Sequence, residues 1–269
     1  MTARYVVRYG SLAYLALILV APVGLIFWRA FEHGLHPFWA AVSNETAVHA
    51  LRLTLEITVI AVPLNTVFGI LCGLAIVRHR VPGMGLVNAI VDLPMALSPV
   101  VVGLALYLLY ARDGWFGPWL SGHGVQILFA LPSMVLATIF VTLPFVVREV
   151  VPVLREIGTE QEEAAATLGA SALATFRRIT LPAIRWAVAY GVVLTAARSL
   201  GEFGAVSIVG GGIAGRTQTM TQYVQASYEN LDQTGAYAGA VLLAALAITT
   251  LLAMTMLRPR AEPHGDRSA

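Results

Sequence analysis

The chain has 269 residues, of which 58% are hydrophobic and 12% are charged, and its formal net charge is +2. A soluble domain of average composition is about 45–50% apolar and about 25% charged. This chain therefore lacks the polar side chains that a soluble fold needs to cover its surface, which excludes a soluble enzyme and a nucleic-acid-binding protein. The single cysteine excludes an internal disulfide, and the sequence has no Cys/His cluster with metal-ligand spacing.

Six apolar runs have the length of about 20 residues that a helix needs to cross a bilayer. They predict an all-α integral membrane protein with spanning helices over residues 9–28, 57–77, 90–110, 125–147, 186–209 and 235–257. The first run lacks a small-x-small cleavage site, which favours an uncleaved helix over a signal peptide. The predicted organisation is an N-terminal segment (1–8), a six-helix transmembrane domain (9–257) and a polar tail (258–269).

The distribution of positive charge predicts the orientation of these helices, because cytoplasmic segments carry an excess of basic residues. All seventeen basic residues are arginines. With a cytoplasmic N-terminus, twelve of them fall inside, four outside and one, Arg198, within the membrane. The inside set is Arg4, Arg8, Arg78, Arg80, Arg148, Arg155, Arg177, Arg178, Arg185, Arg258, Arg260 and Arg267, and the outside set is Arg29, Arg52, Arg112 and Arg216. We therefore expect both termini in the cytoplasm.

The loop between the fourth and fifth runs is predicted to contain two short helices. Thr159, with Glu162 three residues later, forms a capping-box pattern at the start of the first helix. Gly169 can supply the left-handed residue that ends it, and Ser171 can cap the second helix. Pro182 is expected to mark a turn into the fifth span.

Capping signals alone favour a solvated loop that shields the ends of the bundle. The spacing of six residues in this loop, however, matches the EAA loop of the membrane subunits of ABC importers. The matching residues are Glu163, Ala164, Ala165, Gly169, Ile179 and Pro182.

The resemblance extends from about Leu51 to about Leu257. The chain resembles the sulfate/molybdate group of type I ABC importer permeases, and within it most closely the W-type membrane subunits of sulfate/thiosulfate importers. The stretches that carry the likeness are residues 92–94, 98–100, 114–119, 136–149 and 197–206. The Gly-Glu-Phe-Gly stretch that begins at Gly201 is also shared with molybdate permeases.

The resemblance implies a permease subunit without catalytic, cofactor-binding or metal-binding residues, in the inner membrane of a bacterium. Its implied partners are a second, T-type permease, two ATP-binding subunits that hold Mg-ATP, and an external sulfate-binding protein. The EAA helix would insert into a cleft of the ATPase and couple ATP hydrolysis to transport of sulfate or thiosulfate. The sequence itself contains no G-x-x-x-x-G-K-[ST] motif that could cradle phosphates.

Two charged residues, Arg198 and Glu202, fall inside the fifth run, four residues apart and therefore on one helix face. An ionisable side chain at this depth costs several kcal/mol unless it is paired or hydrated. Two interpretations remain open: the pair lines the anion path or its gate, or it is a buried ion pair that fixes the fifth helix against a neighbour. Gly201 and Gly204 beside it permit close helix approach or a break in the helix.

Asp92, near the start of the third run, is expected to cap that helix, because Pro94 would lie just inside the helical start. Three alternatives to sulfate import stay open. Molybdate or tungstate import belongs to the same class, whereas a gradient-driven six-helix transporter or a membrane enzyme belongs to another. A docking loop of the EAA type distinguishes the ABC importers from a gradient-driven transporter and from a membrane enzyme.

Overall fold

We analysed a computed structural model, which describes residues 2–78 and 83–257. Within these residues every regular element is a helix, as expected for an all-α protein. The chain divides into two compact units, residues 1–54 with 212–246 and residues 55–211 with 247–269, and the division falls within α3 and α13. The predicted polar tail (258–269) lies outside the described residues.

The first unit contains α1 (Thr2–Phe31), α2 (Leu35–Ser43), the start of α3 (Glu45–Arg78), α12 (Met220–Glu229) and most of α13 (Gln233–Leu257). Its core consists of Ala47 and Ala50 from α3 packed against Met220 and Tyr223 from α12. The N–H of Met220 donates to the buried hydroxyl of Thr54 (2.9 Å), which ties the start of α12 to α3.

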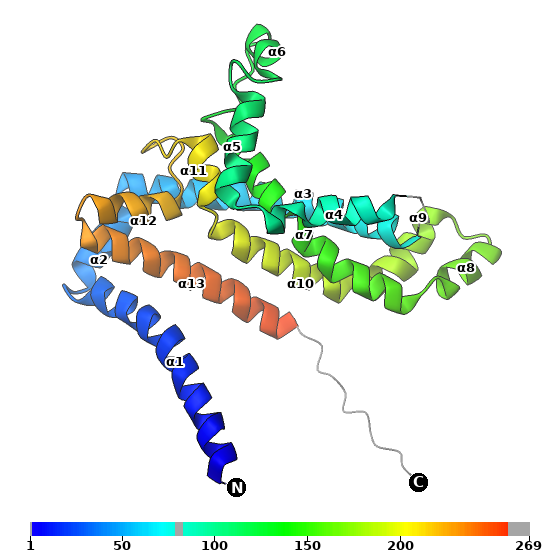
Figure 1. Cartoon of the computed structure of the whole chain (residues 1–269), viewed down its shortest axis with the longest axis horizontal. Coiled ribbons are helices and arrows are strands. Elements are labelled where there is room, and N and C mark those ends of the chain that lie inside the picture. The colour runs from blue at the N-terminus through cyan, green and yellow to red at the C-terminus, as the bar shows by residue number, and fades with distance from the viewer. Residues whose placement is uncertain (1, 79–82, 258–269) are drawn as a thin grey trace. The chain divides into compact units, whose positions relative to one another are not determined.

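The second unit is built around α7 (Leu131–Ile157), which packs against α10 (Leu181–Leu200), α4 (Met84–Ala96), α5 (Pro99–Tyr110) and α11 (Gly204–Gly210) (Figure 1). It also contains the short helices α6 (Gly117–Gly122), α8 (Glu160–Thr167) and α9 (Ala172–Thr175) and the π-helix η1 (Phe176–Thr180). Its main apolar cluster joins α7 and α10 through Val146, Val150, Leu154, Ile184 and Ala187, with side chains of α3 packed against it.

Three helices meet closely at Val146 because two of them present a glycine there. A Cβ on Gly69 of α3 would lie 2.6 Å from the Cβ of Val146, and one on Gly191 of α10 would lie 2.9 Å from its Cα. Without side chains at these two positions, the three helices approach within backbone contact.

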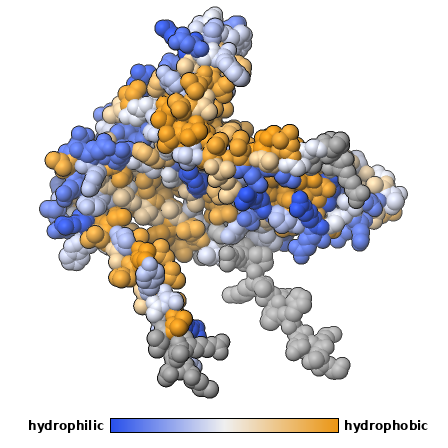
Figure 2. Space-filling model, in the orientation of Figure 1, coloured by the Kyte–Doolittle hydropathy of each residue, from blue (hydrophilic) through white to orange (hydrophobic). Residues whose placement is uncertain are grey.

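Five of the described helices are long and apolar enough to span a membrane, and the bent pair α4–α5 brings the number to six if it is one span. This agrees with the six predicted spans. Large apolar side chains are exposed along these helices, as expected for a protein whose solvent is lipid, and they gather over α4 and α5 (Figure 2).

The predicted third span, residues 90–110, is not one continuous helix but bends between α4 and α5. The axes of α4 and α5 differ by 109°. The break follows from Pro99, which disfavours helical backbone at Ser98 and instead starts a new helix, with Ser98 extended at φ −63° and ψ 136°.

Asp92 does not cap a helix, contrary to the prediction. It lies inside α4, which begins at Met84 with Gly83 as N-cap, and Pro94 is also within the helix. The Oδ1 atom of Asp92 pairs instead with the Nε of Arg148 on α7 (3.0 Å), and both side chains are about half exposed. The charge of this aspartate therefore ties α4 to α7.

The predicted fourth span begins late. Residues 125–130 are not helical, and α7 starts at Leu131 with a proline in its first turn. Phe129 adopts a positive φ of 56°, and its N–H donates to the carbonyl of Val209 (2.8 Å), so this stretch pairs with the end of α11 rather than forming a turn of helix.

Candidate functional site

The first candidate site is the α8–η1 segment, by which we mean residues 158–180 between α7 and α10. Thr159 is the N-cap residue of α8, as predicted, but the predicted capping box is absent. The Thr159 hydroxyl donates to the Glu163 carboxylate (2.6 Å) and makes no bond to a backbone N–H. The Glu162 carboxylate, which should close the box, pairs with Arg78 instead (Nε–Oε2 3.0 Å). The Arg78 guanidinium offers this carboxylate a full positive charge and two N–H groups, whereas the backbone of Thr159 offers one neutral donor.

The predicted end of α8 is confirmed. Gly169 is left-handed, with φ +82°. Its N–H bonds the carbonyl of Ala166 (3.0 Å), and the N–H of Ala170 bonds that of Ala165 (3.0 Å), which is the Schellman pattern. Ser171 then caps α9, as predicted, since its side chain accepts a bond from the N–H of Ala174 (3.3 Å).

The expected turn at Pro182 is wrong, because α9 continues through η1 into α10 without interruption. The backbone at Thr180 and Leu181 is helical, and the N–H of Leu181 bonds the carbonyl of Phe176, five residues back. A proline inside a helix clashes with the carbonyl four residues earlier. The wider π-turn accommodates Pro182 without ending the helix.

The six residues of the motif therefore occupy two elements. Glu163, Ala164, Ala165 and Gly169 belong to α8 and its end, whereas Ile179 lies half-buried in η1 and Pro182 in the first turn of α10. Two large apolar side chains beside them are exposed, Leu168 at 88% and Leu173 at 66%. Leu168 at the end of α8 and Leu173 in α9 thus leave apolar surface uncovered beside the motif.

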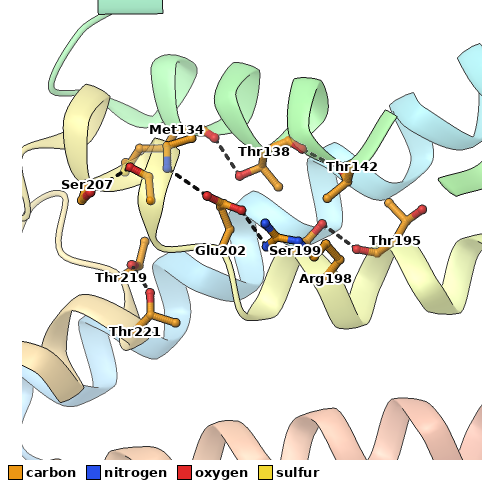
Figure 3. Close-up of polar contacts among 12 residues, drawn as sticks. Met134, Thr138, Thr142, Thr195, Arg198, Ser199, Glu202, Ser207, Thr219 and Thr221 are labelled. Carbon is orange, nitrogen blue, oxygen red and sulfur yellow. Dashed lines mark hydrogen bonds and ion pairs between the residues drawn. The ribbon is translucent and has the colours of Figure 1, made fainter. Parts of the chain in front are cut away.

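The second candidate site is the Arg198–Glu202 pair. The Nη1 of Arg198 lies 2.7 Å from Oε2 of Glu202, and the other carboxylate oxygen accepts a bond from the N–H of Ala205 (2.9 Å) (Figure 3). The side chain of Glu202 is 2% exposed and that of Arg198 is 32% exposed. The pair is thus formed as predicted, with the arginine as its accessible member.

The fifth span ends before Glu202 rather than reaching Val209. α10 stops at Leu200, Gly201 is its C-cap, and α11 begins at Gly204. The break that the glycines permit is therefore present. The Glu202 carboxylate satisfies an N–H of the first turn of α11, where a negative charge is favourable.

The Glu202 segment, by which we mean residues 201–205, lies against the bend between α4 and α5. A Cβ on Gly204 would lie 3.0 Å from the side chain of Pro99, and one on Gly103 would lie 2.7 Å from the carbonyl of Ala205. Two stretches that carry the family resemblance, residues 98–100 and 201–204, are therefore neighbours in space.

A row of buried hydroxyl groups runs between α7 and α10 beside this pair. Thr138 and Thr142 of α7 face Thr195 and Ser199 of α10, and each hydroxyl donates to the carbonyl four residues earlier in its own helix (Figure 3). Asn65 of α3, fully buried, donates to Thr142 (2.7 Å). The surroundings of the ion pair are thus more polar than the apolar composition predicts.

Sequence reasoning missed the role of Arg78 and Thr180, which hold Glu162, and that of Asn65. Spacing gives no signal for them, because their partners are between 18 and 84 residues away in the sequence. Within the described parts of the chain, no group of three or more His, Cys, Asp or Glu side chains is arranged to hold a metal.

The fold is that of an ABC importer permease. It is similar to a chain in the crystal structure of a bacterial ABC transporter that imports the acidic polysaccharide alginate, with a TM-score of 0.79, 21% identity, and coverage of 97% of this chain and 96% of the other.

The chain belongs to the family of binding-protein-dependent transport system inner membrane components, whose model matches residues 65–263. It is 47% identical to the sulfate transport system permease protein CysW of Synechocystis over 97% of this chain and 95% of the relative. It is 36% identical to the CysT permease protein of Salmonella typhimurium over 93% of this chain and 90% of the relative. The higher identity to CysW confirms the W-type resemblance.

Proposed function

We propose that this chain is the membrane-spanning permease subunit of an ATP-driven importer of sulfate or thiosulfate. The observation that carries the proposal is the 47% identity to a sulfate permease over nearly the whole of both chains. A likeness of this extent includes the membrane helices, the α8–η1 segment and the Glu202 segment together, rather than one motif.

The partners in this proposal are a second, T-type permease, two ATP-binding subunits and an external sulfate-binding protein. The separate similarity to a CysT protein supports pairing with a related but distinct permease. ATP is hydrolysed by the partner subunits, and this chain contributes no catalytic group. Selection of the anion falls largely to the external protein.

In the proposed mechanism α8 docks into a cleft of an ATP-binding subunit, with Glu163, Gly169 and the exposed Leu168 on the docking surface. The twelve arginines of the inside set support a cytoplasmic position for this segment and for both termini. Closure of the ATPase pair then pulls on the segment and switches the helices between inward- and outward-facing states.

We place Arg198 on the anion path and assign Glu202 a supporting role. A guanidinium that is one-third exposed can compensate the charge of a passing dianion. The nearly inaccessible carboxylate holds that guanidinium and the start of α11 in place, which avoids direct repulsion between Glu202 and the anion.

Changing Gly169 to valine is expected to uncouple the complex. At φ +82° a β-branched side chain costs about 1–3 kcal/mol of backbone strain, so the end of α8 must rearrange. We expect the purified complex to lose sulfate transport while the chain still inserts in the membrane. The matched control is Gly215→Val, which introduces the same strain at φ +71° in open space outside this segment.

Co-purification from native membranes provides the companion measurement. The tagged wild-type chain should retain an ATP-binding subunit, and Gly169→Val should weaken that retention whereas Gly215→Val should not. Absence of an ATPase from the wild-type preparation, or normal coupling in the Gly169 variant, would contradict docking by α8.

A further inference from the structure

One arginine joins the end of α3 to the end of α7. Arg78 is the last residue of α3, and its guanidinium donates to the carbonyls of Leu154 (3.1 Å) and Gly158 (2.7 Å). These carbonyls lie in the last turn of α7 and just beyond it, where unsatisfied acceptors and the negative end of the helix dipole favour a cation.

The same guanidinium holds α8. Its Nε lies 3.0 Å from Oε2 of Glu162, and its Nη2 donates to Oε1 at 3.2 Å. The hydroxyl of Thr180, buried at the end of η1, also donates to Oε1 (2.7 Å). One carboxylate of α8 is thus connected to α3, to α7 through the arginine, and to the start of α10.

The burial of this cluster distinguishes it from a surface ion pair. The side chains of Arg78 and Glu162 are 13% and 21% exposed, so solvent screens them much less than an exposed pair. The adjacent Glu163 differs, because it is exposed and accepts a bond from Thr159 at the start of its own helix. Neighbouring glutamates therefore point to different sides of α8, one toward the membrane helices and one outward.

A glycine borders α8 at each end. Gly158, which precedes it, has φ +64°, and Gly169, which follows it, has φ +82°, and a Cβ on either would meet no atom within 4 Å. Glycines in open surroundings can absorb a change in backbone direction. A force on α8 would rotate it about these glycines unless a side-chain contact passes the force to the helices.

We propose that the Arg78–Glu162–Thr180 cluster is the joint that transmits movement of α8 to α3, α7 and α10. Glu162 is the positioning residue of this joint and acts through Arg78 and Thr180, without contact to substrate or nucleotide. The inference rests on the proposed docking of α8 to an ATPase and adds the route by which that docking reaches the membrane helices.

The test is the ratio of sulfate transported to ATP hydrolysed by the reconstituted complete complex. Glu162→Gln preserves the size of the side chain and an acceptor for Thr180 but removes the charge. We expect the complex to assemble and hydrolyse ATP while transport per ATP falls about tenfold, within the 5–150-fold range typical of coupling between sites. Arg78→Gln should lower the ratio at least as much, because it also removes the bonds to the carbonyls of Leu154 and Gly158. Combining it with Glu162→Gln should add little to the effect of Arg78→Gln alone, since the contact between the two side chains is then already lost.

Glu156→Gln, an exposed carboxylate in the last turn of α7, is the matched control and should keep the wild-type ratio. The proposal is overturned if Glu162→Gln leaves the ratio of sulfate transported to ATP hydrolysed unchanged. This holds if transport and ATP hydrolysis both stay normal, and also if both fall together, as they would in a destabilised complex. If the glutamine variants fail to assemble, Thr180→Val tests the same cluster, because it removes the hydroxyl that donates to Glu162. If the wild-type complex retains no ATPase, the docking proposal itself fails, which is a different result.

Discussion

Sulfate uptake is expected to be lost when Glu202 is replaced by glutamine, although the complex should still assemble. The substitution leaves an acceptor for the N–H of Ala205 but removes the charge that pairs with Arg198 at 2.7 Å. Breaking a buried pair costs about 3–5 kcal/mol, and we expect about 3 kcal/mol because Arg198 keeps some exposure. The measurements are thermal unfolding in detergent and sulfate uptake by cells that lack the native permease.

Further variants separate the two interpretations of this pair. Glu202→Ala removes the cap of α11 as well and should unfold at a lower temperature than Glu202→Gln. Arg198→Gln should abolish uptake, and so should the double variant Arg198→Gln/Glu202→Gln, although it contains no unpaired charge. Recovery of uptake in the double variant would mean that the pair is structural only and that Arg198 does not compensate the anion. Glu229→Gln, at an exposed position of α12, is the control and should change stability by less than about 0.5 kcal/mol.

Adding one methyl group at Gly191 is expected to destabilise the second unit by about 1–3 kcal/mol, the usual cost of overpacking a well-packed interior. The new Cβ would lie 2.9 Å from the Cα of Val146, and a main-chain atom of a central helix cannot move aside as a side chain can. The helices α7 and α10 must separate, which also disturbs the buried hydroxyl groups between them.

The control for this variant is expected to change the stability in the opposite direction. Gly24 lies within α1, and a Cβ there would meet no atom within 4 Å. Alanine is favoured over glycine in a helix by roughly 0.5–1 kcal/mol. Gly24→Ala should therefore leave thermal unfolding unchanged or raise its midpoint, whereas Gly191→Ala lowers it. Equal effects of the two substitutions would contradict the close packing of three helices at Val146.

The sequence predicted best where the signal is local. Hydropathy alone identifies the membrane helices, because about 20 apolar residues in a row have few other uses. The glycine end of α8 and the serine cap of α9 are also local, and both predictions are confirmed. The pairing of Arg198 with Glu202 could be predicted from their spacing, but the expectation that they share one helix face is wrong, because α10 ends at Leu200.

The predictions failed where a distant residue competes with a local one. The capping box at Thr159 requires Glu162, but that carboxylate binds Arg78, 84 residues earlier in the chain. Asp92 fails to cap a helix because α4 begins earlier, at Met84, and its carboxylate pairs with the distant Arg148. Tertiary contacts of this kind leave no periodic pattern in one sequence.

Proline effects were only partly predictable. A proline restricts the residue before it and removes one donor, yet the surrounding structure decides between a break and a bulge. At Pro99 the chain bends by 109° between α4 and α5. At Pro182 the π-turn η1 keeps the helix continuous. Both prolines lie at the candidate segments, but only the structure shows which of them interrupts the helix.

The central claim is that this chain forms the membrane path of an ATP-driven sulfate importer. Its most direct test is uptake of radioactive sulfate by proteoliposomes that contain the chain with its second permease, ATP-binding subunits and external binding protein. We expect sulfate to accumulate only when ATP is supplied on the side of the membrane that corresponds to the cytoplasm. The accumulation should be inhibited by excess thiosulfate and should persist when ion gradients are collapsed. Uptake that needs an ion gradient but not ATP would contradict the account, and transport of molybdate in preference to sulfate would contradict the assigned substrate.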